Sequence, residues 1–104
     1  MSPAKRLNYQ HLYYFWTVVR AGSLTKAAGE LNLSVPAVSA QLRTLETRLG
    51  EKLLVKAGRR LVPTDTGRTA FRYAEDIFRL GRELVDALAP GPSARPLRLA
   101  IGID

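Results

Sequence analysis

The sequence contains no cysteine and a single histidine. Without cysteine there are no disulfide bonds, no thiolate metal sites and no thiol catalysis. The histidine, His11, has no evident carboxylate or serine partner in the sequence, so we interpret it as a helix-surface or core-edge residue. Asp65, Glu75 and Asp76 lack metal-ligand spacing, and one solvated helix face accounts for them. There is no phosphate loop or dinucleotide glycine motif. We therefore predict no catalytic function, no metal site and no cofactor.

Long hydrophobic runs are also missing. No apolar stretch approaches the length of a membrane span, about 20 residues. The chain does not open with a charged and then apolar leader. Hydrophobic residues make up 46% of its 104 residues and charged residues 24%, which is ordinary for a folded domain. We expect a soluble cytosolic protein of one compact domain with an appended element, and no membrane partner.

Acidic residues are scarce in the first part of the chain. Residues 1–63 contain ten Lys/Arg and three Asp/Glu and thus carry the whole net charge of +7, whereas residues 64–104 contain six of each. A positive field of this kind concentrates polyanions, and nucleic acid is the commonest such partner. The alternative is a solvated basic surface that only maintains solubility.

Apolar residues recur at helical spacing in three segments before residue 50. Asn8, Ser23 and Ser34 stand where their side chains can cap the starts of these helices. Gly22 and Gly50 stand where the first and third helices would stop. The residues expected to face the core are Leu12, Phe15, Trp16, Val19, Leu24, Ala27, Ala28, Leu31, Val38, Leu42, Leu45 and Leu49.

A short turn over residues 32–34 separates the second and third helices. Two β-prone runs, residues 53–55 and 61–62, flank a basic loop over residues 56–60 and predict a small hairpin. Helix, turn, helix and basic hairpin form the layout of a winged helix-turn-helix. We therefore predict a mainly α fold, with three helices and a β-hairpin wing in residues 1–63.

A further helical pattern runs from residue 64 to residue 88, about 35 Å at 1.5 Å per residue. It carries two apolar stripes, and a helix that is apolar on two sides needs two partners. One stripe contains Phe71, Phe78 and Val85. We expect the preceding module to cover one of the two stripes and a second copy of the chain to cover the other stripe. The alternative is that this helix folds back over its own domain. The predicted dimer residues are Tyr73, Ile77, Leu80, Leu84 and Leu88.

The remaining residues divide by composition. Residues 89–96, rich in proline, predict a flexible linker. Residues 97–104 alternate like a strand, and we interpret them as the first strand of a domain that the sequence does not include.

The outward face of the third helix carries short or flexible side chains, which would let its backbone approach base edges in the major groove. Pro36, Ala37 and Ala40 suit thymine methyl groups. Arg43 can reach a guanine or a phosphate, and Ser39 and Gln41 can bond bases or phosphates. The alternative is a neutral surface. The set predicted to bind DNA on this helix is Ser34, Val35, Pro36, Ala37, Ser39, Ala40, Gln41, Arg43 and Thr44.

Phosphate contacts are expected at two other places. The free N–H groups that start the second and third helices, near Ser23 and Ser34, suit phosphate, and Thr25 and Lys26 follow in the first turn of the second helix. Cations on a hairpin tip contact phosphate or enter the minor groove, the alternative being a tip that is only solvated. The predicted wing contacts are Lys56, Arg59 and Arg60.

Six motifs follow one another in a fixed order. They are Leu12-x-x-Phe15, Gly22-Ser23-Leu24-Thr25-Lys26-Ala27-Ala28-x-x-Leu31, Ser34-x-Pro36-Ala37-Val38-Ser39-x-Gln41-Leu42, Leu45-Glu46-x-x-Leu49-Gly50, Leu53-Leu54 and Thr64-x-x-Gly67. Together they resemble the amino-terminal region of the LysR-type transcriptional regulators over about residues 7–88. The stretch over residues 7–16, together with Gly58-Arg59 and Arg72-Tyr73-Ala74, is further similar to the sodium/proton antiporter activator subgroup.

The resemblance implies a bacterial regulator that binds interrupted inverted repeats in promoter DNA as a dimer or tetramer. It implies a dimerising linker helix, followed by an effector-binding domain of periplasmic-binding-protein type. A small-molecule effector would then bind only through that absent domain. The DNA contacts that it carries over are Ser34, Pro36, Ser39, Gln41 and Arg59.

Three residues depart from the family pattern. Val35 replaces a frequent glutamine and Ala40 a frequent base, which shifts the expected readout toward DNA shape and methyl contacts. Lys56 replaces an arginine and loses its bidentate fork. The alternative to promoter binding is a winged-helix module that binds protein or RNA.

Overall fold

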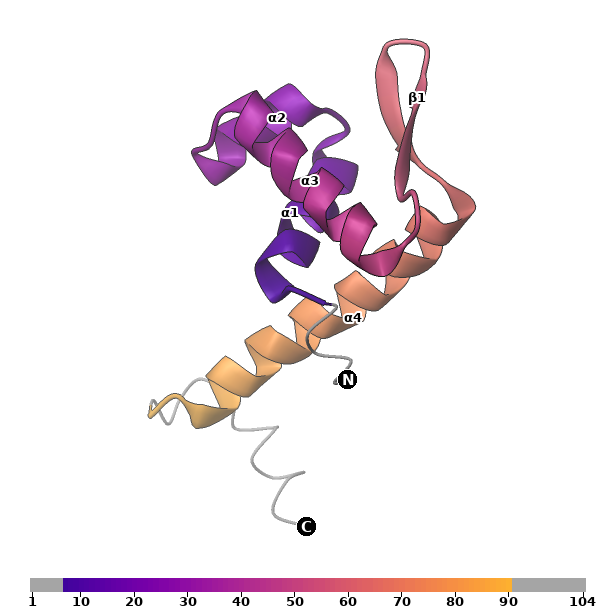
Figure 1. Cartoon of the computed structure of the whole chain (residues 1–104). Helices are drawn as coiled ribbons and strands as arrows, with labels where there is room; N and C mark the ends of the chain where they lie inside the picture. The colour runs from indigo at the N-terminus through magenta and orange to yellow at the C-terminus, as the bar shows by residue number, and fades with distance from the viewer. Residues whose placement is uncertain (1–6, 91–104) are drawn as a thin grey trace.

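A computed structural model describes residues 7–90 of the chain, and its helices and strands follow in the predicted order (Figure 1). Three helices are followed by a two-stranded antiparallel hairpin and a long helix, which confirms the predicted fold class. The predicted strand over residues 97–104 and most of the linker over residues 89–96 lie outside the described residues. The elements are α1 (Tyr9–Ala21), α2 (Leu24–Leu31), α3 (Val35–Leu49), β1 (Leu54–Ala57), β2 (Arg60–Pro63) and α4 (Asp65–Leu88).

Side-chain caps define the helix starts that the sequence predicted. Asn8 accepts a hydrogen bond from the backbone N–H of His11 at 3.0 Å, and Ser23 accepts one from Lys26 at 3.0 Å. α1 and α3 end at glycines with left-handed backbone, Gly22 at φ 82° and Gly50 at φ 72°. The predicted boundaries of the first three helices are therefore confirmed.

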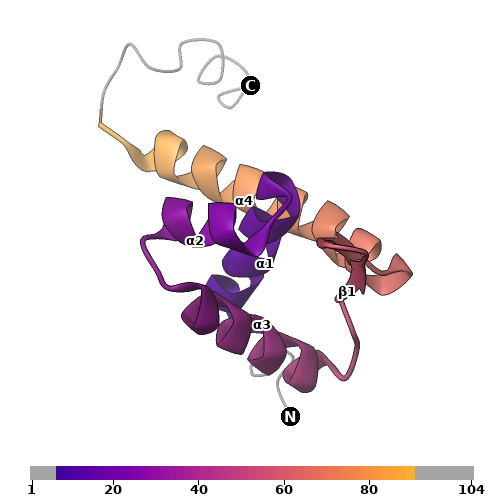
Figure 2. The same ribbon diagram turned by 90° about the horizontal axis from the view of Figure 1, so that it is seen from above.

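α1 is the central helix of the domain and packs against α2, α3 and α4 (Figure 2). Ala27 and Ala28 of α2 are buried, and their small side chains let this helix approach its neighbours closely. Val19, Leu24, Leu31 and Leu49 are only half-buried at the edge of the core. The fully enclosed core is formed by Leu12, Phe15, Trp16, Val18, Ala27, Ala28, Val38, Leu42, Leu45, Leu53, Leu54, Ala74 and Phe78.

The wing is tighter than the sequence predicted. In place of a loop over residues 56–60, the ladder continues through Lys56 opposite Leu61 and Ala57 opposite Arg60. Only Gly58 and Arg59 remain in the turn, and Gly58 has a positive φ of 66°. A glycine in this conformation closes a two-residue hairpin turn without steric cost, so the strands pair further than composition suggested.

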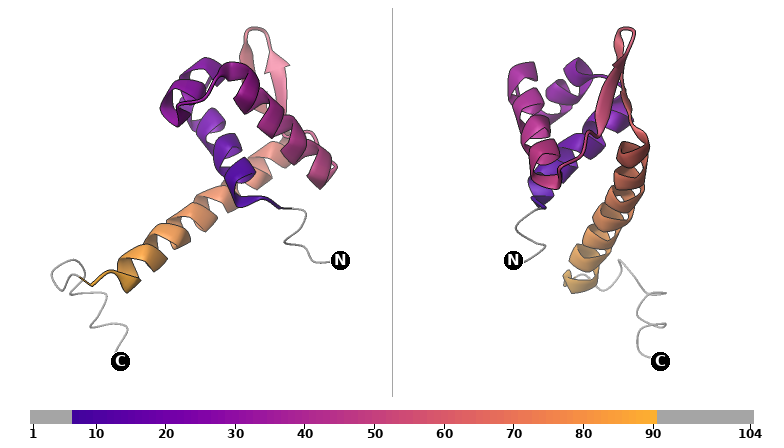
Figure 3. Two further views of the ribbon diagram at one scale, coloured as in Figure 1. Left: turned by 60° about the vertical axis from the view of Figure 1, so that its left-hand side comes forward. Right: turned by 45° about the vertical axis from the view of Figure 1, so that its right-hand side comes forward.

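α4 crosses beneath the three-helix module and continues beyond it (Figure 3). Its buried residues are Gly67, Ala74 and Phe78, so the module covers one face of the helix as far as Phe78, and α1 still lies beside Gly81. Phe71 is half-buried, but Val85, which shares its predicted stripe, is 66% exposed. This stripe is therefore partly covered by the module at Phe71 and Phe78 and open to solvent at Val85.

Candidate nucleic-acid interface

The outward face of α3 is free of contacts with the rest of the module. Pro36, Ala40, Arg43 and Thr44 are exposed, as is Ser34 at the helix start. Val38, Leu42 and Leu45 on the opposite side are buried in the core. The other predicted residues of this helix, Val35, Ala37, Ser39 and Gln41, are half-buried. The apolar stripe thus fixes which side of α3 faces outward.

Two of the predicted readout residues are joined. A guanidinium nitrogen of Arg43 donates a hydrogen bond to Ser39 Oγ at 3.0 Å, one helical turn away. Thr44 Oγ1 donates to the carbonyl of Ala40 at 3.1 Å and lies along the helix. Arg43 is therefore held above Ser39 on the exposed face, rather than extended freely into solvent.

The helix starts also lie where they were predicted. Ser23 is half-buried as the N-cap of α2, and Thr25 and Lys26 in the following turn are exposed. Ser34 Oγ accepts from the N–H of Ala37 at 3.2 Å. Each serine hydroxyl accepts a hydrogen bond from one N–H group of the first turn. The other first-turn N–H groups stay unpaired, and together with the positive end of the helix dipole they can bind an anion.

The wing cations carry charge that nothing on the module neutralises. Lys56, Arg59 and Arg60 are exposed, and within residues 7–90 no acidic group lies at ion-pair distance from them. Arg79 on α4 differs, because the hydrogen bonds that its guanidinium donates to Asp76 and then Glu83 raise its pKa above the ordinary value. Within the described residues the three wing cations therefore carry positive charge that no acidic side chain offsets.

Two residues whose role the sequence does not reveal, Glu46 and Thr64, hold the base of the wing. The carboxylate of Glu46 on α3 accepts hydrogen bonds from the N–H groups of Leu53 and Leu54 at 2.8 and 3.2 Å. Thr64, the N-cap of α4, donates its hydroxyl to the carbonyl of Lys52 at 2.7 Å. Glu46 is one of three acids in a basic module, and both residues belong to motifs that resemble the LysR-type family, but neither signal gives their role.

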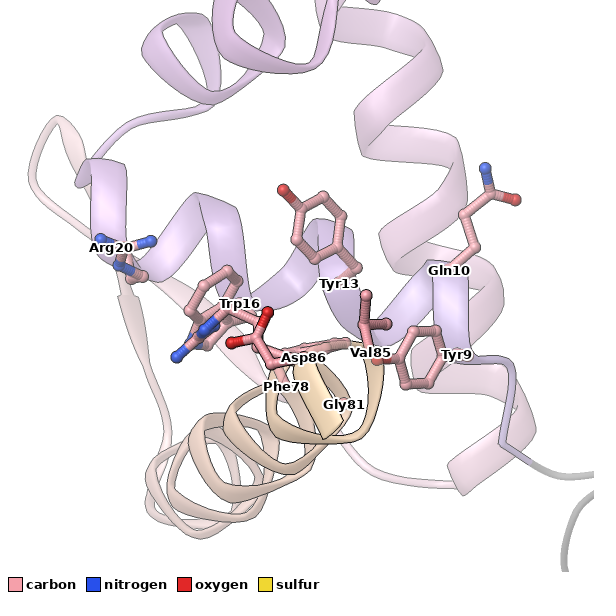
Figure 4. Close-up of a pocket in the computed structure, with 10 residues that line it drawn as sticks. Tyr9, Gln10, Tyr13, Trp16, Arg20, Phe78, Gly81, Val85 and Asp86 are labelled. Atoms are coloured by element: carbon pink, nitrogen blue, oxygen red, sulfur yellow. The ribbon is translucent and has the colours of Figure 1, made fainter. Parts of the chain in front are cut away.

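An apolar groove of about 780 Å³ lies where α1 meets the second half of α4 (Figure 4). Its wall includes an aromatic cluster in which Phe78 meets Tyr9 and Tyr13 edge-on, at centroid distances of 4.9 and 5.4 Å. Trp16 donates its indole N–H to Glu75 at 3.0 Å, so Glu75 is more than part of a solvated face. The groove continues onto Val85 at the exposed end of α4.

The predicted dimer residues of α4 lie outside the core. Ile77 is half-buried, and the other four are among the most exposed large apolar side chains of the described residues. Their exposed fractions are 65% for Tyr73, 55% for Leu80, 59% for Leu84 and 75% for Leu88.

Nothing in the described residues suggests another kind of site. Residues 7–90 contain no group of three or more His, Cys, Asp or Glu side chains that could hold a metal ion. None of the helices in that range is long and apolar enough to cross a membrane. His11 lies within α1 at the core edge, 8% exposed, and its Nδ1 has no hydrogen-bond partner.

Comparison with known proteins identifies related sequences and structures. Residues 9–68 match the family model for the bacterial regulatory helix-turn-helix protein, lysR family. The transcriptional activator protein NhaR of Escherichia coli is 44% identical over 80 residues, which cover 77% of this chain. Those residues are 27% of NhaR, so the chain spans about a quarter of that relative's length.

Two solved structures share the fold. The DNA-binding domain of BenM, in complex with catB site 1 DNA, superposes with a TM-score of 0.73 at 34% identity, covering 76% of this chain and 88% of that one. Full-length CbnR complexed with its target DNA gives a TM-score of 0.71 at 31% identity, covering 78% of this chain and 28% of that one.

Proposed function

Because this chain belongs to the LysR family of bacterial helix-turn-helix regulators, we propose that it binds duplex promoter DNA sequence-specifically, as a homodimer. Residues 1–63 bind the DNA and residues 64–88 form the dimer helix of a transcription regulator that acts in the cytoplasm. The observation that carries this proposal is the exposed face of α3, with Arg43 among small side chains, together with three exposed wing cations that have no ion-pair partner within residues 7–90: Lys56, Arg59 and Arg60. The DNA complexes of BenM and CbnR, which have the same fold, support it.

In this proposal α3 lies in the major groove and its outward face reads the bases. Pro36 and Ala40, both exposed, contact thymine methyl groups, and Arg43 reaches a guanine or a phosphate. Ser39 and Gln41 are half-buried, so they act at the edge of the contact. Val35, Ala37 and Thr44 complete the surface that approaches the bases.

Phosphate contacts then fix the position of α3 in the groove. The N-termini of α2 and α3, at Ser23 and Ser34, face the backbone with free amides, together with Thr25 and Lys26. The wing follows the adjacent backbone or minor groove. Its contacts are Lys56, Arg59 and Arg60.

The dimer forms through α4. The exposed leucines at the end of this helix leave an apolar surface that a monomer would expose to water. A two-fold axis would place the same surface of a second copy against it. Val85, which follows Leu84 and is exposed, also lines the aromatic groove of Figure 4, so α1 would supply part of the same contact. Two copies would then present two recognition helices to the halves of an inverted repeat.

A competition assay tests DNA binding. The chain is incubated with a labelled duplex selected by it from random-sequence DNA, and unlabelled specific duplex, random duplex or single-stranded RNA is added. We expect the specific duplex to compete best. Affinity should fall with salt at about one log–log unit for each phosphate contact. Equal competition by RNA, or an affinity that does not change with salt, would contradict the proposal.

The Ser39–Arg43 pair gives a second test in the same assay. We expect Arg43→Ala to cost about 1–3 kcal/mol of binding free energy on the selected duplex. Ser39→Ala should cost part of the same energy because it releases Arg43, so the double variant should lose less than the sum of the two. Arg72→Ala, which removes the same charge from an exposed site on α4, is the control. Unchanged binding of both single variants would exclude the proposed docking of α3.

A further inference from the structure

The side chain of Glu46 points inward, although it belongs to the helix proposed to read DNA. It is 13% exposed, and one carboxylate oxygen accepts both amide hydrogens at the start of the wing. Lys52 Nζ lies 3.6 Å from the other oxygen. An acidic side chain close to DNA repels phosphate, so the charge of Glu46 does not favour DNA binding. Its contribution at this position is therefore the pair of hydrogen bonds that it accepts from the wing base.

The backbone of Leu53 is held from the opposite side by α4. Its carbonyl accepts a hydrogen bond from the N–H of Thr64 at 3.0 Å, while its N–H goes to Glu46 on α3. Its side chain is 1% exposed in the core. The first residue of the wing base is therefore fixed between α3 and α4.

Beyond this base the wing contacts the rest of the module through β2. Leu61 packs against the core and β2 contacts α1 and α4, whereas all residues from 55 to 60 are exposed. The direction in which Arg59 and Arg60 point therefore depends on this packing of β2 and on the hydrogen bonds at the base, of which those to Glu46 link the wing to α3.

We propose that Glu46 is a positioning residue that fixes the wing relative to α3, so that one rigid surface meets the DNA. This inference rests on the proposed function. With the carboxylate in place, the wing cations stand at a set distance from the recognition helix before binding. Without it, part of the binding free energy must order the hairpin, and the cations meet the phosphates less often.

Three substitutions at this position separate the hydrogen bonds from the charge. Glu46→Gln keeps a side-chain oxygen that accepts both amides. Glu46→Asp keeps the charge but is shorter by one methylene, about 1.5 Å, and no longer reaches them. Glu46→Ala removes both. Glu30→Ala, an exposed acid on α2, is the control for the loss of one negative charge.

Affinity is measured on the duplex selected by the wild-type chain. We expect Glu46→Ala and Glu46→Asp to bind about tenfold more weakly, with a salt slope lower by about one unit for each phosphate that the wing no longer neutralises. Glu46→Gln should bind within about twofold of wild type, since its hydrogen bonds remain. Glu30→Ala should bind as tightly as wild type or more tightly, because it only removes a negative charge. This change in affinity is opposite in sign to the one expected for Glu46→Ala.

A thermodynamic cycle tests whether Glu46 acts through the wing. In an Arg59→Ala/Arg60→Ala background the wing has lost its tip cations, so adding Glu46→Ala should reduce affinity little further. An undiminished further loss would contradict the proposal. So would wild-type affinity and salt slope in Glu46→Ala and Glu46→Asp proteins that circular dichroism shows to be folded.

Hydrogen exchange gives a readout that needs no DNA. The amides of Leu53 and Leu54 should exchange faster in Glu46→Ala and Glu46→Asp than in wild type or Glu46→Gln. If the wild-type chain shows no preference for duplex DNA, the proposed function fails, and the exchange rates still report whether Glu46 holds the wing base. Unchanged exchange in both variants would overturn the positioning role itself.

Discussion

Replacing Gly67 with alanine is expected to lower the free energy of unfolding by about 3 kcal/mol or more, in a domain whose whole stability is of order 5–15 kcal/mol. Gly67 is buried in the first turn of α4, where the helix passes the base of the wing. A Cβ atom at this position would overlap the carbonyl oxygen of Leu53 and lie 3.0 Å from its carbonyl carbon. It would also lie 3.2 Å from Cβ of Pro63.

The obstruction cannot be relieved by a side-chain rotation, because it is backbone. The Leu53 carbonyl accepts the N–H of Thr64, and the Leu53 amide is held by Glu46. Accommodating the methyl group would require α4 to move away from the wing base and give up the bond from Thr64 to the Lys52 carbonyl. The loss of these hydrogen bonds and the loss of close packing therefore both lower the free energy of unfolding, and the two effects add.

Gly29→Ala is the matched control. Gly29 also lies within a helix, α2, but a Cβ there would meet nothing within 4 Å. Alanine should stabilise that helix by about 0.5–1 kcal/mol, the usual gain over glycine. Urea unfolding followed by circular dichroism measures both variants. Equal stability of the two alanine variants would show that the contact between α4 and the wing base does not constrain the fold.

The sequence was informative where a local rule governs the structure. Caps such as Asn8 and Ser34 and left-handed glycines such as Gly50 act within one helical turn, so the helix bounds followed from the pattern. The inward stripe of α3 also determined which face is outward, and with it the exposed positions of Pro36, Ala40 and Arg43.

Features that join separate elements were not predictable in this way. The length of the wing turn depends on how far β1 and β2 stay paired, and composition placed five residues where the ladder leaves two. Glu75 was expected only to be solvated, but it binds Trp16, 59 positions away. Glu46 and Gly67 matter because both meet the Leu53 backbone, which no periodicity in either helix reveals.

Replacing Leu84 with aspartate is expected to convert the proposed dimer into monomers and to weaken binding to a two-half-site duplex by about 10²–10⁴-fold. Leu84 lies in the last two turns of α4 and is 59% exposed. In a two-fold contact each substitution occurs twice, so two charges would be buried in one apolar interface without partners. Each monomer would then hold one half-site only, and the gain from joining two recognition helices would be lost.

Sedimentation equilibrium and binding to duplexes with one or two half-sites measure this effect. Leu84→Asp should sediment as a monomer, bind a single half-site like wild type, and show no gain from the second. Arg72→Glu is the control, since it makes a larger charge change at an exposed site on another face of the same helix. It should remain dimeric. A wild-type chain that is already monomeric, or a Leu84→Asp dimer, would rule out α4 as the dimer contact.

Unfolding curves of the Leu84→Asp monomer are a further measurement. Curves like those of a wild-type monomer would show that Leu84 stabilises the assembly rather than the monomer, as its exposure predicts.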